Sequence, residues 1–204
     1  MLSHTNYCPE LGFLACLFEK PLAIIDFETS THPTSPTGGI FEVAIAKVDL
    51  DGNVTFNSSY VNPESQITDF VKNLTGVDPQ TLNQFPTWGE VWAKEFIEIG
   101  NGCVVLGYNI LSSDLPAAQI QNKRYQFPLP QFQHALDLYE LHKKLNKTNK
   151  GKLHDLAKQY GVQYEGKVHN ALDDVLMTLY LAESMLVKHG VDIFVSSVCR
   201  FVAL

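Results

Sequence analysis

Leu22-Ala-Ile-Ile-Asp-Phe-Glu28 is a run of apolar residues that closes with two acids. Such a run is typical of a buried central strand whose last residues reach a functional site. Because side chains alternate along a strand, Asp26 and Glu28 share one face, whereas Phe27 points to the opposite face and into the core. Neighbouring carboxylates repel each other unless a proton, a hydrogen bond or a cation compensates them, and Mg²⁺ or Mn²⁺ suits such oxygen ligands. Two solvated acids at a strand end are the simpler interpretation of this pair.

The residues that follow predict an antiparallel hairpin. A polar loop, rich in proline and glycine, spans Thr29 to Gly39 and separates the first strand from a second strand at residues 41–48. Asp51-Gly52 supplies a turn, and a third strand returns at residues 54–61.

The rest of the chain alternates helices with short buried strands. Apolar spacing, capping residues and glycines predict strands at 103–108 and 134–138 and helices at 67–74, 87–101, 115–124, 139–145, 152–160 and 171–188. This order predicts one α/β domain, with a five-stranded mixed sheet that carries the hairpin on one side and is flanked by helices.

The two ends of the chain form extensions of this domain. The predicted domain comprises residues 21–190, and residues 1–20 and 191–204 are rich in apolar side chains. Because apolar surface is usually covered, we expect these extensions to pack on the domain as an added layer. A surface for homodimer formation is the alternative interpretation.

Composition excludes several classes of protein. At 204 residues, of which 45% are hydrophobic, the chain has the size of one globular domain with a full core. Its formal charge of −7 offers no basic footprint for nucleic acid, although bound cations can bring phosphate to an acidic site. The four cysteines include no Cys-x-x-Cys pair, which argues against a zinc ribbon or a disulfide framework and favours reduced thiols in the cytosol. The apolar stretch at 11–18 fits neither a membrane span nor a secretion signal.

Two further segments place acids at predicted strand ends and helix starts. Gly107-Tyr-Asn-Ile-Leu-Ser-Ser-Asp114 follows a buried strand and opens a helix, and taken alone it favours a capping role for Asp114. His169-Asn-Ala-Leu-Asp-Asp174 opens the last long helix, with Asp174 on its first or second turn. Neither segment indicates a site by itself.

Taken together, the three segments resemble the DEDD superfamily of 3′–5′ exonucleases. The shared order is Asp-Phe-Glu-Thr, Gly-Tyr-Asn-(x)₄-Asp and His-x-Ala-x-x-Asp. A histidine five residues before Asp174 matches the histidine (DnaQ-like) branch, which includes the proofreading subunit of bacterial DNA polymerase III, ribonuclease T and oligoribonuclease. The other branch has Tyr where this chain has Asn170. The resemblance spans about residues 22–188, with supporting matches at Phe41-Glu-Val-Ala44, Leu74-Thr-Gly-Val77 and Ala135-Leu-Asp-Leu138.

The resemblance implies a ribonuclease-H-like three-layer fold and a defined chemistry. It implies hydrolysis of phosphodiester bonds in single-stranded DNA or at frayed 3′ ends, with release of nucleoside 5′-monophosphates. Two Mg²⁺ or Mn²⁺ ions would be held by Asp26, Glu28, Asp114 and Asp174, and His169 would act as the general base. Contacts with the substrate are implied for Phe27, Thr29, Leu74, Thr75, Tyr108 and Asn109.

Departures from the family pattern leave the substrate open. Tyr108 stands where relatives commonly have histidine, Ser113 replaces an aromatic residue and gives less apolar support, and the loop after Glu28 is longer than usual. An exoribonuclease acting on short RNA and a catalytically silent nucleic-acid-binding module are the alternatives, although the complete set of acids with His169 argues against silence. Five lysines between positions 143 and 152 could steer phosphates or simply form a solvated surface. No segment identifies a polymerase partner.

Overall fold

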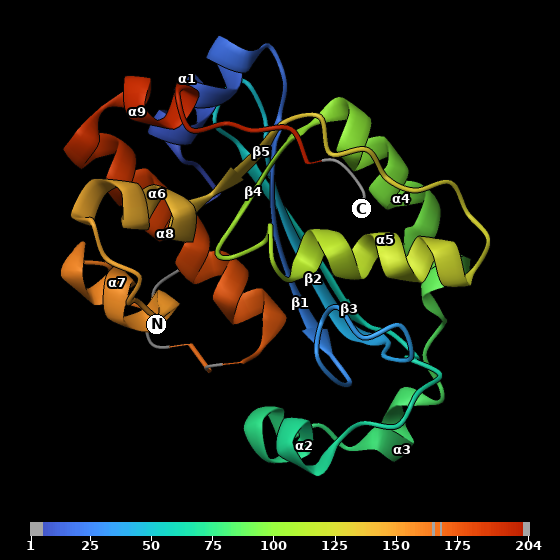
Figure 1. Cartoon of the computed structure of the whole chain (residues 1–204). Helices are drawn as coiled ribbons and strands as arrows, with labels where there is room; N and C mark the ends of the chain where they lie inside the picture. Colours follow the sequence, from blue (N-terminus) through green and yellow to red (C-terminus); the bar gives the residue numbers. More distant parts are fainter. Residues whose placement is uncertain (1–5, 165, 168, 202–204) are drawn as a thin grey trace.

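Within the residues that the computed structural model describes (6–164, 166–167 and 169–201), five strands form one mixed sheet at the centre of the fold (Figure 1). The strands are β1 (Leu22–Thr29), β2 (Ile40–Val48), β3 (Val54–Tyr60), β4 (Val104–Gly107) and β5 (Ala135–Asp137). Their order across the sheet is β3-β2-β1-β4-β5. β1 pairs antiparallel with β2 and parallel with β4, which confirms the predicted mixed sheet with a hairpin on one side.

Helices cover both faces of this sheet. The helices are α1 (Pro9–Phe18), α2 (Asp69–Thr75), α3 (Pro79–Leu82), α4 (Trp88–Gly102), α5 (Asp114–Arg124), α6 (Leu138–Asn146), α7 (Leu153–Gln159), α8 (Ala171–His189) and α9 (Val191–Val195). One core lies between the sheet and α8, with α1, α6, α7 and α9 around it, and a second lies between the sheet and α4 and α5. α2 and α3 lie beyond one end of the strands, where they form a small separate cluster with Phe41 (Figure 1).

The alternation of side chains along β1 determines where its acids lie. Ile24 belongs to the core on the α8 side, whereas Ile25 and Phe27 belong to the core on the α4 and α5 side. Asp26 and Glu28 therefore continue the row of Ile24, on the face that α8 covers. The strand thus delivers both acids to the end of the sheet nearest α2, beside the start of α8 (Figure 1).

Most predicted helices are confirmed to within two residues. α4 starts after Thr87, as predicted, and the Glu90 carboxylate accepts a hydrogen bond from the Thr87 backbone N–H (2.7 Å), which completes a capping box. The sequence pattern did not predict α3, because four residues are too few to show an apolar period. Its start does carry a signal, since Asp78 is the N-cap and Pro79 occupies the first turn.

The terminal extensions supply two more helices that the pattern did not predict. α1 buries Leu11 on the α8 side, and the Glu183 carboxylate of α8 accepts a hydrogen bond from the Leu11 backbone N–H (2.9 Å). α9 buries Phe194, and Cys199 beyond it bridges to Ala135 of β5. The parts of these extensions at 1–5 and 202–204 lie outside the described residues.

None of the helices in the described part of the chain is both long and apolar enough to cross a bilayer. The four cysteines are free thiols. A cytosolic location stays a prediction.

Candidate active site

Three separate segments of the chain meet at the carboxyl end of β1. Asp26 and Glu28 lie on β1, Asp114 is the first residue of α5, and Asp174 lies on the first turn of α8, five residues after His169. Ligand atoms of Glu28, His169 and Asp174 lie within 4.8 Å of one another. Asp26 is half-buried beside them, and the charges of the other three acids act on its carboxyl group. The structure therefore brings together all five residues that the motifs singled out.

The Asp114 carboxylate is anchored to β1. Its side chain is buried, and Oδ1 accepts a hydrogen bond from the Phe27 backbone N–H (2.8 Å). The Ser113 hydroxyl contacts Oδ2 and lies 2.8 Å from the Asn109 carbonyl oxygen. The capping interpretation of Asp114 is wrong, because Ser113 holds the N-cap position of α5 and the Asp114 side chain reaches across to the neighbouring strand. Ser113 supports the acid by a polar contact in place of the expected aromatic packing.

Burial raises the pKa of all four acids, and repulsion from the other site carboxylates adds to the rise at Asp26 and Glu28. Burial is the largest cause at Asp26, followed by the neighbouring carboxylates, and its pKa lies well above the ordinary value. Burial raises the pKa of Glu28 to about 8 and that of Asp114 to about 7, although hydrogen bonds to the Asp114 carboxylate oppose the rise. Burial also raises the pKa of Asp174, against the effect of two nearby histidines. The site thus gathers four acids where burial disfavours their charged forms.

A divalent cation suits this set of donors. Asp174 Oδ1 and His154 Nε2 face each other at 3.5 Å, and each is buried without a hydrogen bond to any residue in the described part of the chain. Buried polar atoms are nearly always partnered, so an oxygen in this position fits a ligand role. Carboxylate oxygens are the ligands that Mg²⁺ and Mn²⁺ prefer, and a cation among the acids would relieve their repulsion.

Two cavities flank the acids. The larger, of about 700 Å³, lies beside Asp26 and Asp174 and is lined by Asp26, Tyr108, Asn109, Tyr139, Gly151, Lys152, Leu153, His154, Lys158, His169 and Asp174. The smaller, of about 390 Å³, lies beside Glu28 and is lined by Glu28, Thr29, Thr31, His32, Pro33, Thr68, Phe70, Val71 and Leu74. Four of the residues expected to touch substrate thus border a cavity: Thr29, Leu74, Tyr108 and Asn109.

The other two expected substrate residues direct their side chains elsewhere. Phe27 is 8% exposed and packs edge-on against Trp88 and Phe96, with ring centroids 5.8 and 5.0 Å away. The Thr75 hydroxyl donates a hydrogen bond to the Val71 carbonyl oxygen (2.9 Å), one turn back in α2. Contact between the substrate and Phe27 or Thr75 stays a prediction, because strand alternation and helix geometry leave neither side chain at the border of a cavity.

Comparison with known proteins adds a family to this geometry. Residues 23–182 match the RNase T family of exonucleases, and the match includes all four acids and His169. The chain belongs to this exonuclease family. Its predicted membership of the DnaQ-like 3′–5′ exonuclease superfamily is thereby confirmed.

Two bacterial proteins are similar to the chain over most of its length. The PolC-type DNA polymerase III of Caldanaerobacter subterraneus subsp. tengcongensis is 28% identical over 171 residues, which are 83% of the chain and 12% of that polymerase. The 3′-5′ exonuclease DinG of Bacillus subtilis is 27% identical over 163 residues, which are 78% of the chain and 17% of DinG. The chain therefore corresponds to a minor part of each relative.

Solved structures of exonucleases share the fold. Exonuclease I superposes with a TM-score of 0.74 at 18% identity, over 87% of the chain and 43% of that structure. The nuclease domain of 3′hExo, a DEDDh family member solved with rAMP, superposes with a TM-score of 0.68 at 21% identity, over 83% of the chain and 93% of the domain. The predicted ribonuclease-H-like fold is confirmed.

The structure adds residues that the motifs did not include. His154 of α7 borders the larger cavity and faces Asp174, but no spacing pattern relates position 154 to the acids. Phe70 of α2 borders the smaller cavity and is 73% exposed. Its signal in the sequence is a large aromatic residue one helical turn before Leu74, on the same face of the predicted helix.

Proposed function

We propose that the chain is a metal-dependent 3′–5′ exonuclease that hydrolyses phosphodiester bonds in single-stranded DNA or at frayed 3′ ends and releases nucleoside 5′-monophosphates. The observation that carries the proposal is the convergence of four acids and His169 at the end of β1. Membership of the exonuclease family supports it. A silent binding module has no need of this complete set.

We expect Asp26, Glu28 and Asp174 to ligate two Mg²⁺ or Mn²⁺ ions directly. Asp114 is expected to act mainly through water, because its two carboxylate oxygens already contact the Phe27 backbone N–H and the Ser113 hydroxyl. When bound, the ions would supply an activated water and neutralise the charge that develops on the leaving 3′ oxygen.

His169 is the residue to which we assign the general-base role. Its ring reaches the carboxylates of Glu28 and Asp174 within 4.8 Å and borders the larger cavity. In the proposed reaction a ring nitrogen takes a proton from the water whose oxygen attacks phosphorus, and the bond to the 3′ oxygen of the preceding nucleotide breaks. Imidazole is the side chain best suited to this transfer near neutral pH.

The two cavities suggest how a strand would lie. We propose that the terminal nucleoside occupies the smaller cavity, where Phe70 and Leu74 offer apolar contact to its base. The preceding nucleotide would then lie in the larger cavity, where Tyr108 offers an aromatic face and Lys152 and Lys158 offer cations to the backbone. The scissile phosphate would thereby meet the acids between the two cavities.

Degradation of labelled oligonucleotides tests the proposal. Single-stranded DNA and RNA of equal sequence, labelled at the 3′ nucleotide, are incubated with Mg²⁺ or Mn²⁺, and the products are separated by size. We expect release of labelled mononucleotides, which EDTA and Asp26→Ala both abolish. Tight binding without hydrolysis under all of these conditions would show that the chain is a nucleic-acid-binding module and not an enzyme.

The same assay shows whether the chain hydrolyses DNA or RNA faster. Exonuclease I has been solved with a dA16 oligonucleotide and the 3′hExo domain with rAMP, so likeness of fold does not distinguish the two polymers for this chain. A faster rate on RNA than on DNA would establish the exoribonuclease alternative and would indicate contacts with the 2′-hydroxyl.

A further inference from the structure

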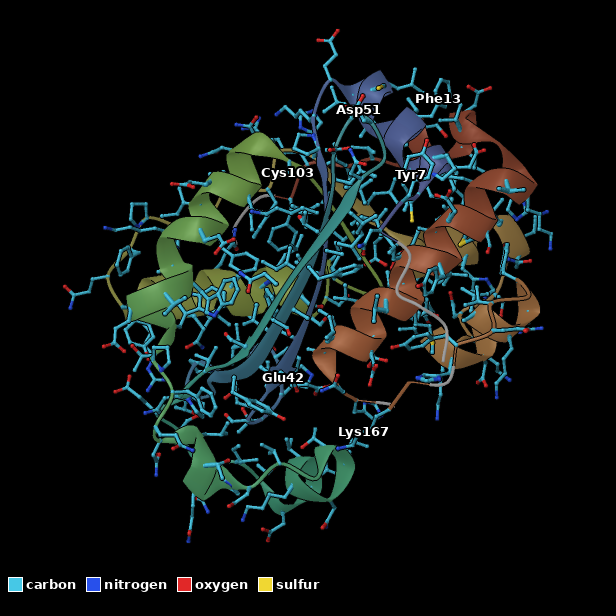
Figure 2. The ribbon with its side chains drawn as sticks, turned by 180° about the vertical axis from the view of Figure 1, so that it is seen from behind. Tyr7, Phe13, Glu42, Asp51, Cys103 and Lys167 are labelled. Atoms are coloured by element: carbon cyan, nitrogen blue, oxygen red, sulfur yellow. The ribbon has the colours of Figure 1, made fainter. Side chains whose placement is uncertain are left out.

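Glu42 is a buried acid that the proposed reaction does not use. It lies on β2, directly opposite Glu28 in the antiparallel pair, and is 8% exposed. Figure 2 shows it at the end of the sheet, above the segment that carries Lys167. Burial raises its pKa to about 7, although the Ala171 backbone N–H and the Lys167 charge oppose the rise. A carboxyl group kept in such a place needs partners to offset its loss of water.

Its partners come from the start of α8. Asn170 Nδ2 donates a hydrogen bond to Glu42 Oε1 at 2.7 Å, and the Ala171 backbone N–H faces the Glu42 carboxylate and lowers its pKa. These two contacts attach the first residues of α8 to β2. The Asn170–Glu42 bond joins residues 128 positions apart, so it is a tertiary anchor that local helix formation does not supply.

Asn170 joins this anchor to the site. Its Oδ1 accepts a hydrogen bond from the Asp173 backbone N–H (3.2 Å) and so caps α8, which leaves its Nδ2 free for Glu42. Its carbonyl oxygen accepts from the Asp174 backbone N–H (3.0 Å). His169, the preceding residue, has a φ of +60°, a left-handed conformation that a non-glycine residue keeps only where its neighbours hold it.

We propose that Glu42 is a positioning residue, which acts through Asn170 to hold His169 and Asp174 against Asp26 and Glu28. The inference rests on the proposed function, because the roles of His169 and Asp174 come from it. Glu42 itself touches neither metal nor substrate in this scheme. A contribution to folding alone is the competing interpretation, and the variants below separate the two.

Two substitutions remove the anchor from opposite sides. Asn170→Ser keeps a hydroxyl that can cap α8 but removes the Nδ2 donor that Glu42 accepts. Glu42→Ala removes the acceptor, and Glu42→Gln restores an acceptor oxygen without the charge. Glu183→Ala is the matched control, because Glu183 is a partly buried acid that accepts backbone hydrogen bonds from Glu10 and Leu11 at the other end of α8.

We expect Asn170→Ser and Glu42→Ala each to lower kcat and to weaken Mn²⁺ binding by about 10- to 100-fold, as loss of a residue that orients metal ligands does. KM should change by less than about threefold, since neither side chain borders a cavity. Glu42→Gln should recover most of both properties, and the double variant should lose no more than either single variant. Glu183→Ala should lower Tm and leave kcat and Mn²⁺ affinity unchanged.

Calorimetric titration with Mn²⁺ and single-turnover hydrolysis of single-stranded DNA provide the two readouts. The inference is overturned if Asn170→Ser and Glu42→Ala lower only Tm, as the Glu183→Ala control does. If Glu42→Ala does not fold, Asn170→Ser alone carries the test. If the unmodified chain hydrolyses no substrate, the proposed function fails. Mn²⁺ binding then decides the inference by itself: weaker binding in the two variants supports it, and unchanged binding overturns it.

Discussion

His169 precedes α8 by two residues and stands in a backbone conformation that few histidines adopt. We predict that His169→Ala lowers kcat by about 10²- to 10⁴-fold, the usual contribution of a general base. Tm and Mn²⁺ affinity should change little, because the ring is only half-buried and the acids remain. Single-turnover rates with thermal unfolding as a check provide the measurement. A variant with the full rate would refute the assignment.

We expect His154 to limit the orientations that the Asp174 carboxylate can take. Its Nε2 is buried 3.5 Å from Asp174 Oδ1, and its own position on α7 depends on the packing of that helix against α8. We predict that His154→Ala lowers the rate by at least about tenfold and that His154→Gln, which keeps a terminal donor, loses less.

The control for His154 is another histidine outside the site. His189 bonds to the Tyr160 hydroxyl at 2.8 Å near the end of α8, so His189→Ala should leave the rate unchanged. Equal rates for His154→Ala and His189→Ala would show that His154 of α7 does not orient the Asp174 carboxylate.

The motif residues could be predicted as a set, from the resemblance that the three segments carry together, whereas the residues that support them could not. The four acids lie at predicted strand ends or helix starts, which can be recognised from local patterns in the sequence: Asp26, Glu28, Asp114 and Asp174. His154 approaches Asp174 only because α7 packs beside α8, and no period in the sequence records that contact. Side-chain roles that arise from tertiary packing are invisible to patterns of local spacing.

α2 presents an apolar face to the smaller cavity. Phe70 is 73% exposed and Leu74 is 40% exposed, and they are separated by one helical turn. We predict that Phe70→Ala raises KM by at least about fivefold, since stacking on a base contributes about 1 to 3 kcal/mol. Tm should not change, because an exposed side chain adds little to the core.

Val187→Ala serves as the control for Phe70→Ala. Val187 is 70% exposed on α8 and borders neither cavity, so its loss should leave KM and Tm as they are. An unchanged KM for Phe70→Ala would show that the terminal base does not bind against Phe70.

Elements with a clear start or a long period were predictable, and short ones were not. α4 has both a capping box and a 15-residue amphipathic pattern, and its prediction agrees with the structure. α3 has four residues, and α9 has five, so neither shows a full apolar period. α1 was not predicted for a different reason. The apolar run from Leu11 to Phe18 has no polar face that would identify it as a surface helix.

The clustered acids make the stability of the whole chain depend on pH and on cations. Glu28, Asp114 and Glu42 have pKa values of about 8, 7 and 7 in the folded chain, against ordinary values of 3.8 to 4.5. Between about pH 4.5 and pH 8 the folded chain therefore binds more protons than the unfolded chain. Stability then falls as the pH rises through this window.

We accordingly predict that Tm in EDTA falls between pH 5 and pH 8 and that Mn²⁺ raises Tm more at pH 8 than at pH 5. In a chain of this length each kcal/mol corresponds to about 2 to 4 °C. Differential scanning calorimetry at both pH values measures the effect. Asp26→Asn should flatten the pH dependence, and an equally steep decline in that variant would contradict the explanation.

Self-association through the N-terminal extension stays a prediction. Phe13 and Leu17, two large apolar side chains of α1, are 54% and 49% exposed. If they form a homodimer, size-exclusion chromatography with light scattering should give twice the chain mass, and Phe13→Asp should return it to one. A monomer at high concentration counts against the dimer.

Asp137 is the last residue of β5, and its carboxylate accepts hydrogen bonds from four backbone N–H groups. Oδ1 and Oδ2 accept from Asn109 and Leu111 in the loop after β4, at 2.8 and 3.1 Å, and the same group caps α6 through Tyr139 and Glu140. Two parts of the lining of the larger cavity, at Asn109 and Tyr139, are thus tied to one buried carboxylate that does not itself border the cavity. A single missense change at this codon would loosen both segments at once, so a natural variant could keep the four acids and His169 and still be a poor enzyme.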